Sequence, residues 1–359
     1  MELNTAFSNL ISSRLNDVLH LIESLFTIPE RTEAKTSFAD VPDKISFRNS
    51  EIVLYGVPLD ITTSFGKGTR RGPEATRVTS ARQIETLIFE EGTDISQIAK
   101  IFDLGDLKLP RFRNLVRQAE GKNFGNTEEK KIMQKKRNII LSVISFLDKS
   151  IPRVTKALYY DAGKIPLLIG GEHTLSYYTI KALAREEPMI IHFDAHRDMK
   201  KEFDNMKICH TTPFFHLINE GHIKGKDLVQ IGIRQSDKEE NVTAQNSRVT
   251  TFDAWSLHDN VEPLLLRLNK LTQSRKIYIS FDIDVYDLPF VPCTGTPEPF
   301  GLSPFEVVRV VKSIHKTANL IGMDMVEVSA RSNDFREGAL ATHTLYRILA
   351  REFVKKKII

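Results

Sequence analysis

The chain has 359 residues, 41% of them apolar and 27% charged, proportions of an ordinary globular protein that argue against global disorder. No run of about 18 apolar residues occurs, which argues against a membrane span. The formal charge of +4 and the pI of about 8.8 are mildly basic. The basic stretches lack the interleaved aromatic residues of a nucleic-acid platform, so we expect neither a nucleic-acid nor a membrane partner.

Only two cysteines occur, Cys209 and Cys293, and the first residues lack the pattern of a secretory signal. Two cysteines give no disulfide framework and are typical of a reducing compartment, so we expect a cytoplasmic protein. We expect Cys209 to be a packing residue rather than a nucleophile.

Residues 1–48 are expected to form an N-terminal helical extension and linker, and residues 49–359 the main domain, which the motifs below predict to be catalytic. The linker, Thr32–Lys44, is mostly polar. The amphipathic helix is expected to end before Pro29, because apolar residues recur at helical spacing at Leu10, Ile11, Leu15, Leu19, Ile22 and Leu25.

From residue 51 onward, short apolar runs alternate with helical patterns. The runs are 52–58, 167–170, 189–194, 228–234, 277–284 and 321–328, and the clearest helical patterns are 174–186, 303–317 and 336–354. Several runs are continuously apolar, as expected of strands buried on both faces of a parallel sheet. We therefore expect one α/β domain whose ligands bind beyond the carboxyl ends of the strands.

Acidic residues and histidines gather where three of these runs end. The clusters are Gly170-Gly171-Glu172-His173, Asp194-Ala195-His196-Arg197-Asp198 and Asp282-Ile283-Asp284. In an extended chain residues i, i+2 and i+4 share a face, so the side chains of Asp194, His196 and Asp198 can converge, as can those of Asp282 and Asp284. The alternative, a set of helix-capping and turn aspartates, would not place three such clusters on one sheet.

Carboxylates with some imidazole suit Mn²⁺ and similar divalent ions, whereas structural zinc prefers thiolates. Four carboxylates around a single ion would leave excess negative charge, so two ions with shared carboxylates are expected. A bridging hydroxide then leaves one negative charge, which a cationic substrate would balance. The Gly170–Gly171 pair is expected to let the backbone pass close to the metals.

These motifs carry a family resemblance. GGEH (170–173), DAHRD (194–198) and SFDIDVYD followed by PCTGTP (280–297) resemble the signature blocks of the ureohydrolase family, which includes arginase, agmatinase, guanidinobutyrase, formimidoylglutamase and guanidinase. The likeness spans roughly residues 50–350. It implies a three-layer arginase-like α/β fold with a mainly parallel central sheet, preceded here by the N-terminal helical extension, and a homotrimer or homohexamer.

The resemblance also implies roles for individual residues. One ion would be held by His173, Asp194, Asp198 and Asp282, and the other by Asp194, His196, Asp282 and Asp284. Glu327 would receive the guanidinium group, and His210 would shuttle protons beside it. The ions would be Mn²⁺, as is usual in the family, or Ni²⁺, as in some members.

The implied reaction is hydrolysis of a guanidino compound to urea and an amine. The ions lower the pKa of a bridging water, and the resulting hydroxide attacks the guanidinium carbon that Glu327 orients. Asp198 is expected to relay a proton to the leaving amine, and His210 to exchange protons with solvent.

The expected substrate is agmatine, because the segment between Asp198 and His210 lacks the Asn/Ser-rich loop of arginases and HTTPF resembles the agmatinase form. Cys293 and Phe300 replace glycines, which would narrow the pocket and keeps free guanidine as an alternative. Arg197 stands where small or neutral residues are common. It would favour arginine or guanidinobutyrate if it attracts a carboxylate, or it points to solvent and pairs with an acid.

Two other departures from the family pattern are Glu172 in a usual Asp position and Leu288 in a usual Pro position.

Two further classes of protein remain as alternatives. Zinc deacetylases of the histone-deacetylase type share the fold but need one metal and fewer carboxylates, and a non-catalytic subunit should have lost ligand positions. All six positions are filled here, which argues against both.

Overall fold

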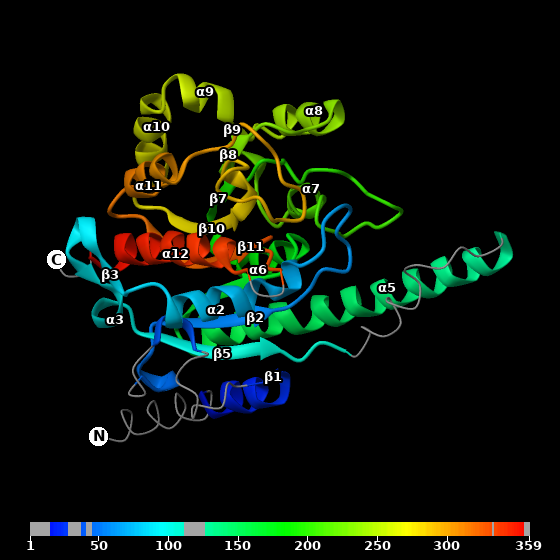
Figure 1. Ribbon diagram of the computed structural model, residues 1–359, viewed down its shortest axis with the longest axis horizontal. Helices are drawn as coiled ribbons and strands as arrows, with labels where there is room; N and C mark the ends of the chain where they lie inside the picture. The colour runs from blue at the N-terminus through cyan, green and yellow to red at the C-terminus, as the bar shows by residue number, and fades with distance from the viewer. Residues whose placement is uncertain (1–14, 28–36, 41–44, 111–125, 332–333, 355–359) are drawn as a thin grey trace.

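The computed structural model describes residues 15–27, 37–40, 45–110, 126–331 and 334–354 (Figure 1). Residues 15–25 are helical, and Val18, Leu21 and Ile22 are buried on one face of that helix. Leu10 and Ile11, the first residues of the predicted helix, lie outside the described residues, as does most of the predicted linker.

A mainly parallel sheet forms the centre of the molecule. In the described part of the chain it has nine strands in the order β1-β5-β2-β6-β11-β10-β7-β8-β9, and only β1 runs antiparallel to its neighbour. The strands are β1 (Phe26–Thr27), β2 (Ile52–Val57), β5 (Ile101–Leu107), β6 (Ile165–Gly170), β7 (Met189–Phe193), β8 (Leu228–Ile233), β9 (Thr250–Asp253), β10 (Lys276–Asp282) and β11 (Asn319–Val326). A separate hairpin pairs β3 (Leu87–Ile88) with β4 (Thr93–Asp94).

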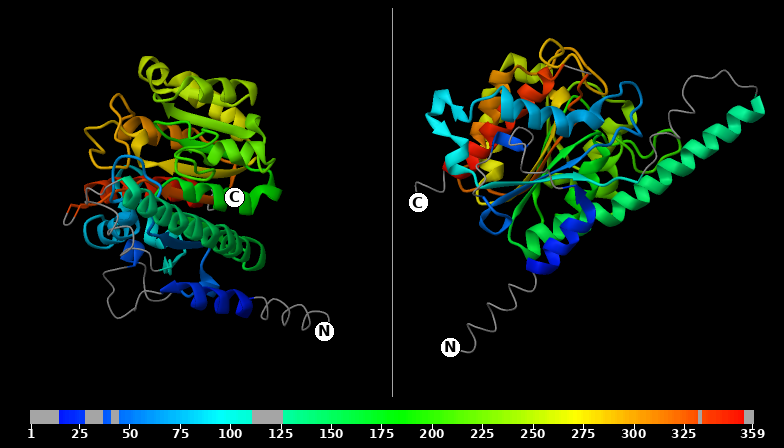
Figure 2. Two further views of the ribbon diagram at one scale, coloured as in Figure 1. Left: turned by 90° about the vertical axis from the view of Figure 1, so that its right-hand side faces the viewer. Right: turned by 60° about the horizontal axis from the view of Figure 1, so that its bottom comes forward.

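Helices cover both faces of this sheet (Figure 1; Figure 2). On one face α2 and α11 pack against α12, and α10 packs against α11, while on the other face α6 packs against α5 and α7. The helices are α2 (Gly72–Arg82), α3 (Ile95–Ile98), α5 (Asn126–Lys156), α6 (Thr174–Leu183), α7 (Pro213–Asn219), α8 (Lys238–Asn246), α9 (Ala254–Asp259), α10 (Glu262–Thr272), α11 (Pro304–Ser313) and α12 (Arg336–Val354). The expected three-layer α/β architecture is confirmed.

Alternating side chains of the central strands enter two different cores. In β6, Leu167 and Ile169 pack in the core that includes α11 and α12, whereas Leu168 packs in the core that includes α5 and α6. This two-sided burial explains the continuously apolar runs, since a strand covered by helices on both faces has no solvent-facing side.

The predicted runs and helices match the observed elements to within about two residues at most ends. Among the described elements that were not predicted are the central strand β5, which contains Asp103, Gly105 and Asp106, and helices α2, α5 and α10. The first half of α5 extends beyond the body of the molecule (Figure 2). Within the described residues, no helix combines the length and apolar character needed to cross a membrane.

The strand order decides where the polar clusters meet. Strands β6, β11, β10 and β7 are consecutive neighbours, and each is followed at its carboxyl end by one or more of the predicted site residues. Since the four strands are parallel, these residues lie along one edge of the sheet.

Candidate metal centre

His173 lies just beyond the carboxyl end of β6, and hydrogen bonds of the surrounding loop fix its backbone. The neighbouring Glu172 is fully buried and accepts hydrogen bonds from the Thr62 backbone N–H at 2.8 Å, from the Thr62 hydroxyl at 2.6 Å and from the Thr174 hydroxyl at 3.0 Å. A carboxylate held by three donors cannot swing, so the backbone that carries His173 is fixed.

The glycine pair before His173 has a packing role that the sequence did not predict. A Cβ at Gly171 would lie 1.7 Å from the carbonyl oxygen of Leu59, and a Cβ at Gly170 would lie 2.8 Å from the side chain of Val326. The pair therefore allows close packing against a neighbouring loop and strand.

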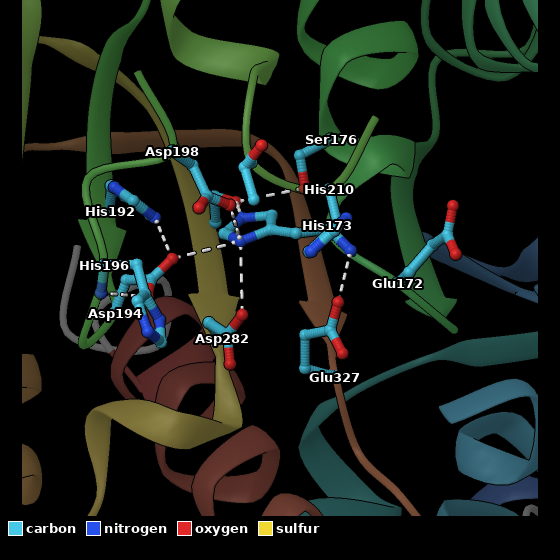
Figure 3. A network of polar contacts seen from close by, with 12 residues as sticks. Glu172, His173, Ser176, His192, Asp194, His196, Asp198, His210, Asp282 and Glu327 are labelled. Carbon is cyan, nitrogen blue, oxygen red and sulfur yellow. Dashed lines mark hydrogen bonds and ion pairs between the residues drawn. The ribbon is translucent and has the colours of Figure 1, made fainter. Parts of the chain in front are cut away.

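Three carboxylates surround one nitrogen of His173 (Figure 3). Its Nδ1 lies 3.0 Å from Asp194 Oδ2, 3.0 Å from Asp198 Oδ2 and 3.2 Å from Asp282 Oδ2, yet it forms no hydrogen bond of acceptable geometry. The side chains are almost completely buried. Such a buried group without a partner requires an explanation, such as an ion between the atoms.

A second group of the same kind lies beside the first. The Nδ1 of His196 lies 3.4 Å from Asp194 Oδ1 and 3.1 Å from Asp284 Oδ2, and this Asp284 oxygen is buried without a hydrogen-bond partner. Asp194 therefore places one oxygen in each group. We call these six residues the carboxylate–histidine centre: His173, Asp194, His196, Asp198, Asp282 and Asp284.

The spacing of these atoms fits divalent ions. Ligands about 2.1 Å from an octahedral ion lie about 3.0 Å from one another, which matches the contacts around His173 Nδ1. Compact sets of possible ligand atoms occur at His173, His192 and Asp194 and at Asp194, His196 and Asp284. The donor set of oxygens and imidazole nitrogens suits Mn²⁺-like ions.

The electrostatics of the centre also require added positive charge. Burial disfavours a charged ring at His173 and His196, yet the surrounding carboxylates outweigh it and hold the pKa of each histidine well above its usual value. Burial and the neighbouring Asp194 raise the pKa of Asp198 to about 7, and burial with Asp284 and Asp194 raises that of Asp282. Without ions, the centre can lower its charge only by holding protons.

Two of the predicted site residues have left-handed backbones. The φ angle is 52° at Asp198 and 58° at Glu327, a region that costs a non-glycine residue roughly 1–2 kcal/mol. Strain of this kind clusters at functional sites, where the surrounding structure holds it in place.

Glu327 follows β11 and presents one free oxygen. Its Oε1 accepts the backbone N–H of His173 at 2.8 Å, whereas its buried Oε2 has no hydrogen-bond partner. A Cβ at Gly295 would lie 2.6 Å from that oxygen, so the loop passes close to it. Burial, followed by the charge of Glu172, raises the pKa of Glu327 well above its usual value. The structure therefore leaves one buried oxygen of this carboxylate without a donor.

His210 lies in the loop between β7 and α7. Its backbone N–H donates to the Thr62 hydroxyl at 3.2 Å, its Nε2 lies 3.1 Å from the Ser64 hydroxyl, and its Nδ1 is buried without a partner. Burial, followed by the charges of His196 and His173, lowers the pKa of His210 to about 4. The Glu172 carboxylate and the His210 backbone N–H thus both form hydrogen bonds with Thr62, which links the loop after β6 to the loop after β7.

The sequence interpretation missed two kinds of supporting residue. His192 Nε2 lies 2.8 Å from Asp194 Oδ2, and its place two residues earlier in the same strand could have revealed it. His173 Nε2 lies 3.1 Å from the Ser280 hydroxyl, which lies 2.8 Å from the buried Asp324 carboxylate. This contact leaves the other ring nitrogen of His173 facing the carboxylates.

Arg197 neither reaches the centre nor pairs with an acid, in contrast to both expectations for it. Its guanidinium donates to Asn241, Gln230 and Thr251 instead. The ring of Phe300 is 58% exposed and packs against Trp255, with centroids 5.2 Å apart, so its bulk is directed to the surface rather than into the pocket. Cys293 is half-buried and Leu288 is exposed.

The chain matches the family model described as "Arginase family" over residues 50–350. The chain belongs to the arginase family. Among relatives, it is 33% identical to an agmatinase of Bacillus anthracis, covering 79% of this chain and 85% of the relative. It is also 30% identical to the human protein named guanidino acid hydrolase, mitochondrial, covering 82% of this chain and 75% of the relative.

Solved structures of the family have the same architecture. The proclavaminate amidino hydrolase of Streptomyces clavuligerus superposes with a TM-score of 0.71 at 27% identity, covering 88% of this chain and 96% of that chain. The names of these relatives refer to different guanidino compounds, so membership of the arginase family fixes the reaction type more firmly than the substrate.

Proposed function

We propose that this arginase-family chain is a binuclear-metal hydrolase that cleaves a guanidino compound, with agmatine as the preferred substrate, to urea and an amine. The observation that carries the proposal is the carboxylate–histidine centre, in which possible ligand atoms lie about 3 Å apart. Two of them, His173 Nδ1 and Asp284 Oδ2, are buried without hydrogen-bond partners, as is Glu327 Oε2. The agmatinase relatives support the choice of substrate.

The centre would hold two ions. His173, Asp194, Asp198 and Asp282 would hold one, and His196, Asp194, Asp282 and Asp284 the other, so that Asp194 and Asp282 are shared. When bound, two divalent ions neutralise the carboxylates and activate a water as nucleophile near neutral pH. We propose Mn²⁺ for both positions, because the donors are mainly oxygens, with Ni²⁺ as the alternative.

The residues around the centre orient the substrate. The unpartnered Glu327 Oε2 would accept charge-assisted hydrogen bonds from the guanidinium, whose plane is then fixed because Glu327 Oε1 is already held by the His173 backbone. Asp198, whose Oδ2 lies 3.0 Å from His173 Nδ1 inside the centre, would relay a proton to the leaving amine.

His210 would exchange protons beside the substrate. Its low pKa keeps the ring neutral at pH 7, so Nδ1 or Nε2 is free to accept a proton. The Ser64 hydroxyl at 3.1 Å is exposed and gives the ring a path to solvent.

Agmatine is preferred over guanidino acids for two reasons. The segment Met199–Cys209 lacks the Asn/Ser-rich pattern of arginases. In addition, Arg197 is turned away from the centre and bonded elsewhere, which removes the cation expected to attract a substrate carboxylate.

The test is urea release from protein loaded with Mn²⁺ and, separately, with Ni²⁺. Agmatine, arginine, 4-guanidinobutyrate and guanidine are offered in parallel, with Asp194→Asn as the inactive variant and Asp148→Asn, an exposed carboxylate on α5, as the matched control. We expect agmatine turnover that Asp194→Asn abolishes and Asp148→Asn leaves intact. Preference for another compound would refute the substrate, and no urea from protein holding two ions would refute the reaction.

We also propose a homotrimer or homohexamer, as the family resemblance implies. Light scattering of the metal-loaded protein gives the mass directly, and a monomer of 40.9 kDa would contradict this assembly.

A further inference from the structure

Arg197 lies inside the metal motif, between His196 and Asp198, but its side chain leaves the centre. Its Nε donates to Asn241 Oδ1 at 2.8 Å, and its NH1 donates to Gln230 Oε1 at 2.8 Å and to Thr251 Oγ1 at 3.0 Å. All three acceptors are neutral. A half-buried guanidinium among neutral partners is costly to desolvate, which suggests that its hydrogen bonds serve another purpose.

These bonds fix the orientation of the Gln230 amide. A guanidinium can only donate hydrogen bonds, so the Gln230 atom that faces it must be the oxygen. The backbone oxygen of Arg197 can only accept, and it lies 2.8 Å from the other end of the amide, Nε2. The two contacts require the same orientation, and Gln230 is fully buried, so the amide has no alternative partner in water.

The fixed amide in turn sets the tautomer of His192. Gln230 Nε2 lies 3.2 Å from His192 Nδ1 and must donate to it, so this ring nitrogen carries no proton. The single ring proton then lies on Nε2, which donates to Asp194 Oδ2 at 2.8 Å. Phe214 packs against the ring, with centroids 4.0 Å apart, and limits its rotation.

Asp194 is the carboxylate shared by both halves of the centre, so its orientation affects both (Figure 3). With the opposite His192 tautomer, a nitrogen lone pair would face Asp194 Oδ2 and repel it. We propose that Arg197 is a positioning residue: through Gln230 it fixes the His192 tautomer that holds Asp194 in place to bind metal. This inference rests on the proposed metal centre, and it concerns a residue that contacts neither substrate nor ion.

The decisive variant is Gln230→Glu. The new carboxylate would keep the contact with the Arg197 guanidinium but could not donate to His192 Nδ1, so we expect the ring proton to move to Nδ1. Arg197→Met removes the donors that orient Gln230 while keeping an apolar stem. Arg309→Met, which removes an exposed guanidinium paired with Glu262, is the matched control.

Two measurements read the effect. Ring ¹⁵N chemical shifts of histidine-labelled, ion-free protein, with the His192 signals identified by their loss in His192→Phe, report the tautomer. Competition with a chelator reports Mn²⁺ affinity, which we expect to fall about 10- to 100-fold in Gln230→Glu and about tenfold in Arg197→Met, as is usual for residues that support metal ligands. Arg309→Met should match the parent protein.

A proton that stays on Nε2 in both variants, or unchanged Mn²⁺ affinity in both, would overturn the proposal. The tautomer is read without ions, so it decides the hydrogen-bond relay even if the parent protein binds no metal. Failure of the parent protein to bind Mn²⁺ would instead refute the metal centre itself.

Discussion

Glu327→Gln should separate substrate binding from stability. The glutamine keeps a carbonyl oxygen to accept the His173 N–H, which Glu327 Oε1 now accepts at 2.8 Å. It replaces the free Oε2 with an amide that can only donate, and a guanidinium can only donate too. The variant therefore loses the charge-assisted bonds to substrate while the loop around His173 is retained.

The magnitude follows from the burial of that oxygen. Removing one partner of a buried charge pair costs about 2–5 kcal/mol, so kcat/KM for agmatine should fall about 30- to 4,000-fold. Stability should change in the opposite direction. Since the pKa of Glu327 is raised in the fold, the unfolded chain loses this proton first as pH rises above about 4.3, and the folded state becomes less stable.

Glutamine removes that penalty. Glutamine cannot ionise, so a neutral amide takes the place of a buried group that can be charged. Removing that buried charge is worth about 1–3 kcal/mol, or roughly 1–4 °C in Tm for a chain of this size. The assays are steady-state kinetics and thermal unfolding of chelated protein at pH 7. Glu337→Gln is the control, because Glu337 is also buried, has an unpartnered Oε1 and a pKa raised by burial, but lies outside the centre. It should gain stability at unchanged kcat/KM. Retained activity or a lowered Tm in Glu327→Gln would refute the reasoning.

Three further outcomes are expected. Gly171→Ala should cost at least about 3 kcal/mol, because its Cβ would overlap the Leu59 carbonyl, whereas Gly163→Ala, with φ of 65° and open space, should cost only about 1 kcal/mol; equal losses in urea unfolding would contradict this. Phe300→Gly should be about 1 kcal/mol more stable than Phe300→Ala, because both lose the Trp255 contact but only glycine accepts φ of 64° without strain; the reverse order would disprove it. Mn²⁺ binding should release protons and become tighter from pH 6 to 8, because the pKa values of His173 and His196 are raised and the ions must displace protons from them. The measurement is calorimetry in buffers of different ionisation enthalpy. A binding enthalpy that does not depend on the buffer would contradict this prediction.

The sequence predicted the edge of the sheet at which the polar residues gather, for a simple physical reason. A strand buried on both faces shows as an apolar run, and the end of the run marks the carboxyl end of the strand, where Asp194 and Asp282 lie. Period-two alternation then places Asp194 and Asp198 on one side. The sequence did not predict that β6, β11, β10 and β7 are adjacent in the sheet, because strand order depends on contacts between segments distant in sequence.

Side-chain direction after a strand ends was the main failure. Arg197 was expected at the pocket or in solvent, but its direction depends on acceptors at positions 230, 241 and 251, on β8, α8 and β9. Phe300 was expected to narrow the pocket, but the loop conformation turns its ring towards Trp255. The role of Gly171 depended in the same way on Leu59, more than a hundred residues earlier. Local pattern cannot specify such contacts, since each is set by packing between elements.

The electrostatic cost of the centre indicates how the fold and the ions depend on each other. Four carboxylates converge in a buried space, and the backbone of Asp198 also has a left-handed conformation. No local preference favours this arrangement, so the surrounding sheet and its hydrogen bonds must impose it. Bound cations replace carboxylate repulsion with attraction, and they stabilise the folded state because the unfolded chain does not assemble the site. Metal loading should therefore raise Tm, whereas Asp194→Asn, which removes the shared carboxylate, should lose most of that rise. It should also destabilise the ion-free protein, because, despite burial, His192, His173 and His196 hold the pKa of Asp194 well below its usual value. A variant that kept the full metal-dependent rise would mean that the ions bind elsewhere.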